Sequence, residues 1–320
     1  METYPTNGWP DPALPEDFAP VAALDRAGLV ESWHYGMAAV VGPDGQLRAN
    51  LGSADRAFYP RSAVKPLQAV AMRRAGLHLT GAQLAISVAS HHGTEAHTNL
   101  VSQVLAGAGL TEADLQCPVA WPGNPDARSA AQSQTRLAFN CSGKHAGFLA
   151  TCVAAGWDTK TYLQFEHPLQ VSIRQALEEY SGEPINFTTV DGCGAPLHVM
   201  TVAGLARAMS RLALNDGEIC DAMVQNAWAV GDATTPDALL MSEGLIAKLG
   251  AEGVMAVTTV DGWGACVKIA DGSHRASALV AAKLLHQVGA ISGAQLTRLN
   301  EKLAVLSLGG ATELGRLRAL

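Results

Sequence analysis

The chain has 320 residues, of which 48% are hydrophobic and 16% are charged, so it can bury a full core without metals or disulfides. Its formal net charge is -7 and it has no basic run, which argues against nucleic acid as a partner. No apolar stretch is long enough to cross a bilayer and the first residues lack a signal-peptide pattern. We therefore expect a cytoplasmic protein with no membrane contact, whose scattered cysteines are reduced.

The N-terminal region divides into two parts. Residues 1–21 are rich in proline and lack apolar periodicity, which predicts an extended arm before a single domain over residues 22–320. Residues 35–41 and 46–51 alternate as strands do, and the turn sequence Gly42-Pro43-Asp44-Gly45 separates them. We expect a β-hairpin here and structure from about Ala22 onward.

The middle of the chain has apolar residues at helical spacing, and the C-terminal part returns to strands. Helices are expected at residues 63–75, 99–108, 146–155, 199–212 and 219–230, with a further helix between Pro168 and Gly182. Strands are expected at residues 254–260 and 265–270. The predicted fold class is α+β: an antiparallel sheet built from N- and C-terminal strands, flanked by helices, plus a helical lobe.

The first candidate site is the segment Arg61-Ser-Ala-Val-Lys-Pro-Leu-Gln68. Positions three apart share one face of a helix, so Ser62 and Lys65 can approach each other, and Pro66 confines the helix start to the residues around Ser62. A neutral lysine beside a serine at a helix start can accept the hydroxyl proton. The alternative is an ordinary capping serine followed by a surface lysine.

Two further segments are rich in polar groups. Residues 89–97 crowd Ser90 together with three histidines into one turn, and the alternative is a solvated loop in which Thr94 or Thr98 caps the next helix. Residues 140–147 place Cys141 and Lys144 at the same spacing as the serine and lysine above. With Cys193 they form a possible soft-ligand zinc site, and the alternative is a helix cap with two inert buried cysteines.

The fourth candidate is Lys268, which falls inside an alternating apolar strand. It either lies on an exposed face or points into a site whose environment lowers its pKa. Taken together and in this order, the four segments resemble the L-asparaginase II family of the rhizobial type. The resemblance also includes His167-Pro-Leu-Gln170 and Asp191-Gly-Cys-Gly-Ala-Pro196.

The resemblance implies a fold similar to serine β-lactamases and bacterial glutaminases, a homodimer, and hydrolysis of L-asparagine to aspartate and ammonia. It implies two catalytic Ser-Lys pairs, Ser62 with Lys65 and Ser90 with Lys268. Arg61, His145 and Asp191 would then bind substrate or lie beside the site. Cys141, Lys144 and Cys193 would hold a zinc ion that orients the pocket or adjusts affinity.

Three functions are therefore open. The first is an L-asparaginase, in which either serine is the nucleophile. The second is a glutaminase or another β-lactamase-like hydrolase with the same Ser62-Lys65 pair. The third is a non-catalytic protein that binds zinc or an amino acid, in which Ser62 is only a helix cap.

Overall fold

The computed structural model describes residues 13–320. Strands from both ends of the sequence form one eight-stranded antiparallel sheet in the order β11-β12-β1-β2-β10-β9-β8, with β3 paired to β2. The strands are β1 (Ala19–Arg26), β2 (Leu29–Val41), β3 (Leu47–Leu51), β8 (Ile246–Gly250), β9 (Val254–Thr258), β10 (Gly264–Ile269), β11 (Leu306–Gly309) and β12 (Thr312–Ala319). Two small pairs accompany it, β4 (Ala57–Phe58) with β7 (Met200–Thr201) and β5 (Thr188–Val190) with β6 (Pro196–His198).

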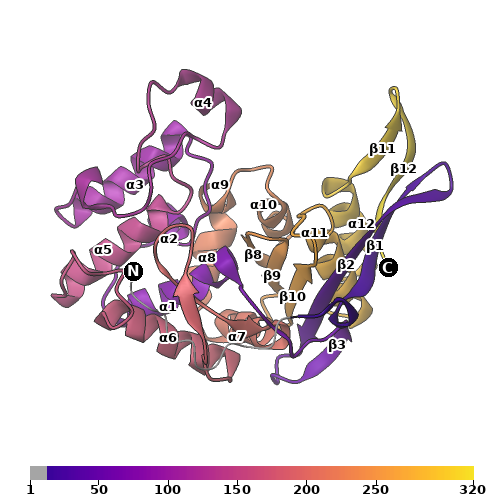
Figure 1. The fold of residues 1–320 in the computed structure, drawn as a ribbon, viewed down its shortest axis with the longest axis horizontal. Helices are drawn as coiled ribbons and strands as arrows, with labels where there is room; N and C mark the ends of the chain where they lie inside the picture. The colour runs from indigo at the N-terminus through magenta and orange to yellow at the C-terminus, as the bar shows by residue number, and fades with distance from the viewer. Residues whose placement is uncertain (1–12) are drawn as a thin grey trace.

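Most helices come from the middle of the chain and gather on one side of the sheet as a helical lobe (Figure 1). Among the described residues the α-helices are α1 (Lys65–Arg74), α2 (Gly81–Ser87), α3 (Glu95–Gly107), α4 (Pro125–Ala130), α5 (Ser142–Ala155), α6 (Pro168–Ser181), α7 (Val202–Asn215), α8 (Gly217–Gln225), α9 (Ala227–Val230), α10 (Pro236–Met241), α11 (Ser277–Gln287) and α12 (Gly293–Lys302). Short 3₁₀ turns are η1 (Pro15–Asp17), η2 (Arg61–Val64) and η3 (Glu112–Asp114).

The core lies where the sheet meets the helices. All side chains of β9 are buried, and successive strand side chains point to opposite faces, so both faces of the sheet are covered there. Helices α7 and α11 pack on β9, β10 and β2. The strands β1, β2, β11 and β12 continue beyond these helices as a wing that projects away from the helical lobe (Figure 1).

The predicted α+β architecture is confirmed, including the pairing of N- and C-terminal strands: Ala38 lies opposite Val267. The predicted hairpin is present, with Ala38 opposite Leu51. Pro168 opens α6 and Gly182, at φ 72°, ends it.

Several boundaries were wrong. β1 begins at Ala19, so strand structure begins before Ala22; residues 1–12 of the predicted arm lie outside the described residues. The helix expected over 199–212 begins at Val202, because Met200 and Thr201 pair with β4. The helix expected over 219–230 is split into α8 and α9 at Asn226, whose ψ of 43° is not helical.

No helix among residues 13–320 is long and apolar enough to cross a membrane.

Candidate active site

The turn that carries Ser62 is strained and tightly packed. Arg61 has φ 53°, in the left-handed region that side chains other than glycine rarely adopt. Its Nε donates to Asp191 Oδ1 at 2.7 Å, which holds the strained residue in place. Pro66 lies in the first turn of α1, so the 3₁₀ turn η2 places the half-buried Ser62 just before that helix, as the sequence predicts.

Strand β8 packs directly on this turn. A Cβ atom added to Gly250, the last residue of β8, would lie 2.4 Å from the carbonyl oxygen of Pro60. Only glycine therefore allows this backbone-to-backbone approach. The edge strand β8 therefore lies directly against the turn that carries Ser62.

Lys65 lies at the centre of a cluster that also contains Ser90 and Cys141. Its side chain is buried, with 1% exposure. Nζ donates to Ser90 Oγ and to Cys141 Sγ, each at 3.1 Å, and to the carbonyl oxygen of Ala89. Within residues 13–320 no hydrogen bond joins it to Ser62 Oγ, although the two residues are three apart in one helical segment. The Lys65 side chain thus joins three of the four sequence-predicted segments.

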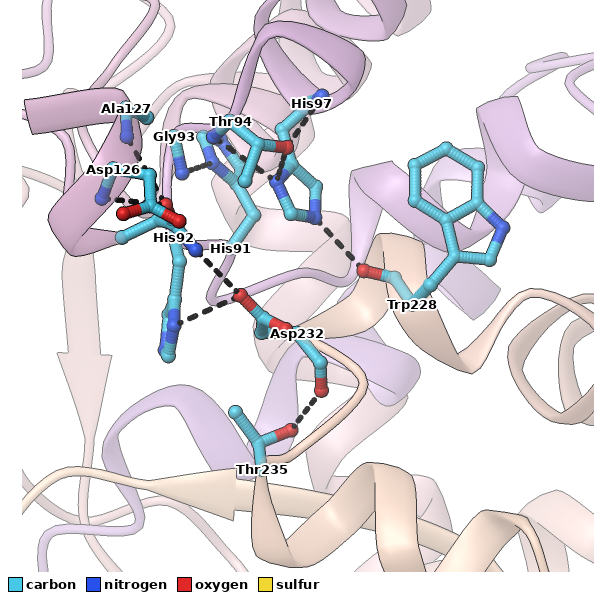
Figure 2. A network of polar contacts seen from close by, with 11 residues as sticks. His91, His92, Gly93, Thr94, His97, Asp126, Ala127, Trp228, Asp232 and Thr235 are labelled. Atoms are coloured by element: carbon cyan, nitrogen blue, oxygen red, sulfur yellow. Dashed lines mark hydrogen bonds and ion pairs between the residues drawn. The ribbon is translucent and has the colours of Figure 1, made fainter. Parts of the chain in front are cut away.

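The loop after Ser90 is fixed by its histidines (Figure 2). The Ser90 amide donates to the carbonyl oxygen of Val230. His91 Nδ1 accepts from the Gly93 amide at 3.1 Å, so Nε2 carries the proton and donates to Ser142 Oγ at 2.9 Å. Burial holds the pKa of His91 well below its usual value, so the ring is neutral.

A second set of contacts joins the same region to α9 and to the residues directly after it (Figure 2). His92 Nδ1 lies 3.6 Å from Asp232 Oδ2, to which Asn124 also donates. His97 Nε2 bonds to the Trp228 carbonyl at 2.8 Å. Thr94 caps α3 by accepting from the His97 amide, which is the capping role that the sequence offers as the alternative for this segment. The loop is therefore both a cap and the support of Ser90.

The predicted metal ligands also converge. Lys144 Nζ donates to Cys193 Sγ at 3.0 Å, and the Cys141 thiol donates to the same sulfur. This thiol and Lys144 hold the pKa of Cys193 well below the usual value for cysteine despite burial. Cys141, which keeps its proton in this pair, has a raised pKa. These contacts favour the thiolate form of Cys193 within the cluster.

The donor chemistry fits zinc in part. Two cysteine sulfurs and an amine are soft and borderline ligands, as zinc prefers. Burial opposes the charge on Lys144, but Cys193 and Cys141 outweigh burial and raise its pKa, so metal binding must displace a proton from this amine. Within residues 13–320 no group of three histidine, cysteine or acidic side chains is placed to hold a metal, so a site here depends on Lys144.

Asp191 and His145 border the sulfur cluster. Burial would raise the pKa of Asp191, but Lys144 and Arg61 outweigh it and keep the carboxylate charged. His145 Nδ1 bonds to Tyr162 Oη at 2.7 Å, and its buried Nε2 has no hydrogen-bond partner. Burial, together with the charge of Lys144, holds the pKa of His145 well below its usual value.

Lys268 does not reach Ser90. Its Nζ donates to the backbone oxygens of Glu252 and Ile269, and Ser90 is bonded to Lys65 instead. The predicted Ser90–Lys268 pair is therefore not formed. Burial does lower the pKa of Lys268, as expected for a strand lysine that is not on an open face.

Sequence reasoning missed Lys248, a second buried lysine on β8. It has 0% exposure, and burial together with the nearby charge of Lys65 lowers its pKa to about 8, although Asp237 opposes the shift. Its Nζ lies 3.4 Å from Asp237 Oδ2, and that carboxylate is also buried. The signal in the sequence was a lysine between apolar residues at 246–249, directly before Gly250.

The fold and this cluster define a mixed α+β protein whose candidate site combines serine hydroxyls with buried lysines and a thiolate. The family model of L-asparaginase II matches residues 22–319, so the chain belongs to the L-asparaginase II family. No curated protein matches the chain significantly.

Solved structures with similar folds are distant in sequence. The native form of Mglu is 14% identical with a TM-score of 0.44, over 81% of this chain and 65% of that chain. Mglu in its glutamate form is 14% identical with a TM-score of 0.48, over 79% of this chain and 60% of that one. A β-lactamase from Mycobacterium bovis is 17% identical with a TM-score of 0.40, over 79% and 94% of the two chains. The chain thus spans less than two-thirds of the length of these Mglu structures.

Proposed function

We propose that the protein is an amidohydrolase that converts L-asparagine to L-aspartate and ammonia through a serine activated by a lysine. Membership of the L-asparaginase II family supports the reaction class. The observation that carries the proposal is Lys65: a fully buried amine that contacts Ser90 Oγ and follows Ser62 by three residues. A buried lysine beside a serine is the arrangement that activates a hydroxyl without histidine.

In this mechanism the serine oxygen attacks the side-chain amide carbon and its proton passes to a neutral lysine. The C–N bond then breaks, the nitrogen leaves as ammonia with a proton from the lysine, and water hydrolyses the aspartyl ester. Ser90 is the hydroxyl that Lys65 holds, while Ser62 lies on the strained turn beside it. The charges of Arg61 and Asp191 complement the α-carboxylate and the α-ammonium group of an amino acid.

Lys248 is better placed than Lys268 to act as the second lysine. It is wholly buried, interacts electrostatically with Lys65 and Cys141, and has a pKa lowered to about 8. Such a group can exchange a proton with its surroundings near neutral pH. Lys268, held by two backbone oxygens, would instead stabilise the end of β10.

The decisive experiment is to assay ammonia release from asparagine and from glutamine with Ser62→Ala, Ser90→Ala and Lys65→Met. We expect each variant to lose about 10²- to 10⁴-fold in kcat while keeping its thermal stability. Ser210→Ala is a matched control, because this buried serine hydroxyl bonds only to backbone oxygens. Wild-type turnover in all three variants would instead favour a non-catalytic amino-acid or zinc-binding protein.

Glutaminase activity is the nearest alternative within the same chemistry. The two amides differ by one methylene group, for which a pocket discriminates by only about 1–3 kcal/mol. The ratio of kcat/KM for the two substrates decides between them, and turnover of nitrocefin would indicate a β-lactamase-like hydrolase.

We propose that Cys141, Lys144 and Cys193 hold one zinc ion that orients Asp191 and adjusts affinity. When bound, the ion would supply positive charge next to the substrate pocket. We expect about one zinc per chain by elemental analysis, loss of the metal in Cys193→Ser, and no loss in the control Cys220→Ser, since Cys220 bonds only to the Leu212 carbonyl. Zinc retained by Cys193→Ser would refute this ligand set.

We propose that the protein is a homodimer located in the cytoplasm. All six cysteines are buried and none of them forms a disulfide, as a reducing compartment permits. On the wing, Leu29, Trp33 and Tyr35 of β2 are exposed large hydrophobic side chains, with 75%, 52% and 49% exposure. We expect light scattering to give twice the monomer mass and Trp33→Glu to weaken association. A monomer at all concentrations would exclude the dimer.

A further inference from the structure

A cavity away from the serine–lysine cluster lies between α6 and the β5–β6 hairpin, and we call it the α6 cavity. Its volume is about 300 Å³, within the range of small-ligand sites. Along one side run residues from the start of α6, and opposite them lie residues of the hairpin base. The lining comprises Phe165, Glu166, Gln170, Val171, Arg174, Ile185, Asn186, Phe187, Thr188 and His198. None of these residues belongs to the candidate active site.

Two side chains of this lining leave buried polar atoms without a hydrogen-bond partner. Gln170, with 2% exposure, donates through Nε2 to the Tyr162 carbonyl at 2.7 Å, but its Oε1 is unpaired. His198, with 5% exposure, bonds through Nδ1 to Thr188 Oγ1 at 2.8 Å, and its Nε2 is unpaired. An unpaired buried polar group costs about 1–3 kcal/mol, so the cavity contains groups that a ligand can satisfy.

The charges of the lining are of both signs. Arg174 and Glu166 form no ion pair with each other or with any other residue in the described chain. Burial and the nearby Arg174 lower the pKa of His198 to about 4, so the imidazole is neutral and adds no second positive charge. The cavity thus offers one guanidinium group, one carboxylate and a carbonyl oxygen around a partly apolar space.

We propose that the α6 cavity binds a small free α-amino acid, with its carboxylate at Arg174 and its ammonium group toward Glu166 and Gln170 Oε1. An arginine recognises a carboxylate through two parallel hydrogen bonds, and a carboxylate with an amide oxygen is a complement for an ammonium group. The apolar lining accommodates an uncharged side chain. This binding site does not depend on whether the chain hydrolyses asparagine.

The α6 cavity is connected to the candidate active site by two structural routes. Thr188 and His198 are opposite each other at the base of the hairpin whose tip carries Asp191 and Cys193. Gln170 holds the backbone of Tyr162, whose hydroxyl bonds to His145. A bound amino acid would therefore contact elements that support the candidate site.

Isothermal titration calorimetry with L-methionine, L-phenylalanine and L-glutamine tests the proposal. We expect at least one probe to bind once per chain. Phenethylamine lacks the carboxylate of L-phenylalanine, and 3-phenylpropionate lacks its ammonium group. Each analogue should bind at least about tenfold more weakly than L-phenylalanine. Arg174→Met should weaken binding by about tenfold or more, and Arg174→Lys by less.

Control variants distinguish binding at the α6 cavity from binding at the candidate active site. Arg128→Met, at an exposed arginine of α4, and Asp191→Ala should both bind the probes as the wild type does. If Arg174→Met does not fold, judged by circular dichroism, Glu166→Gln takes its place and should also weaken binding. No binding of any probe up to about 10 mM, full binding by the folded variants, or loss of binding in Asp191→Ala would overturn the proposal.

Discussion

Single residues decide which lysines can act in the site. Lys248 lies on β8 and Lys268 on β10, and of the two only Lys248 is fully buried and interacts electrostatically with Lys65. We expect Lys248→Met to lower kcat for asparagine by about 10²-fold or more, and Lys268→Met to lower it far less. Thermal melts of both variants exclude unfolding as the cause. A larger loss of kcat in Lys268→Met than in Lys248→Met would favour Lys268, the lysine that the sequence predicts, as the second catalytic lysine.

The pH dependence of the reaction follows from Lys248. With a pKa lowered to about 8, its amine loses the proton as pH rises through that value, so kcat/KM should increase across it if the neutral form is required. The carboxylate of Asp237 stabilises the charged form and raises this pKa. Asp237→Asn should therefore move the rise to lower pH, as measured from the pH profile of ammonia release. An unchanged profile would show that Lys248 does not titrate in the reaction.

The sequence predicted residue types better than residue partners. The spacing of Ser62 and Lys65 predicts that both lie where a helix starts, and the structure places Ser62 in η2 and Lys65 at the first position of α1, which follows η2 directly. It does not indicate that Lys65 Nζ would bond to Ser90 and Cys141, because that depends on how α2, α5 and η2 pack. Lys248 was missed although it lies between apolar residues, because its burial beside Asp237 follows from how α10 packs against β8.

At the scale of elements, β8 packs closely against η2, the turn that carries Ser62. We expect Gly250→Ala to push the turn away, since the new Cβ would lie 2.4 Å from a backbone oxygen of Pro60. Activity should fall strongly and the unfolding temperature should drop. Gly107→Ala is the matched control, because a Cβ at that helical position meets nothing within 4 Å.

Gly107→Ala should leave the free energy of unfolding unchanged or raise it by up to about 1 kcal/mol, since alanine favours the helix. Equal behaviour of the two alanine variants in ammonia release and thermal melts would show that the β8–η2 contact does not position the serine.

Element types were predictable from apolar periodicity. Strands β1 and β12 were not, because their sequences mix exposed and buried positions without a regular pattern.

At the scale of the molecule, strand β2 runs from the exposed wing into the covered centre of the sheet. β2 has 13 residues: the first three are exposed, exposed and more buried positions then alternate as far as Tyr35, and the last six are all buried. The pairing of sequence ends could be inferred because strands occur at both ends and helices between them. The extent of the wing could not, since it depends on β12 lying beside β1.

This division within β2 has a consequence for motion. The amides of Met37 to Val41 lie in the covered centre of the sheet, so they should exchange their hydrogens with solvent deuterium only when the whole protein unfolds. The amides near Leu29 and Val30 need only a local opening of the wing. Mass-resolved deuterium uptake should therefore divide one continuous strand into a slow half and a fast half, and assembly through the wing would slow the fast half alone.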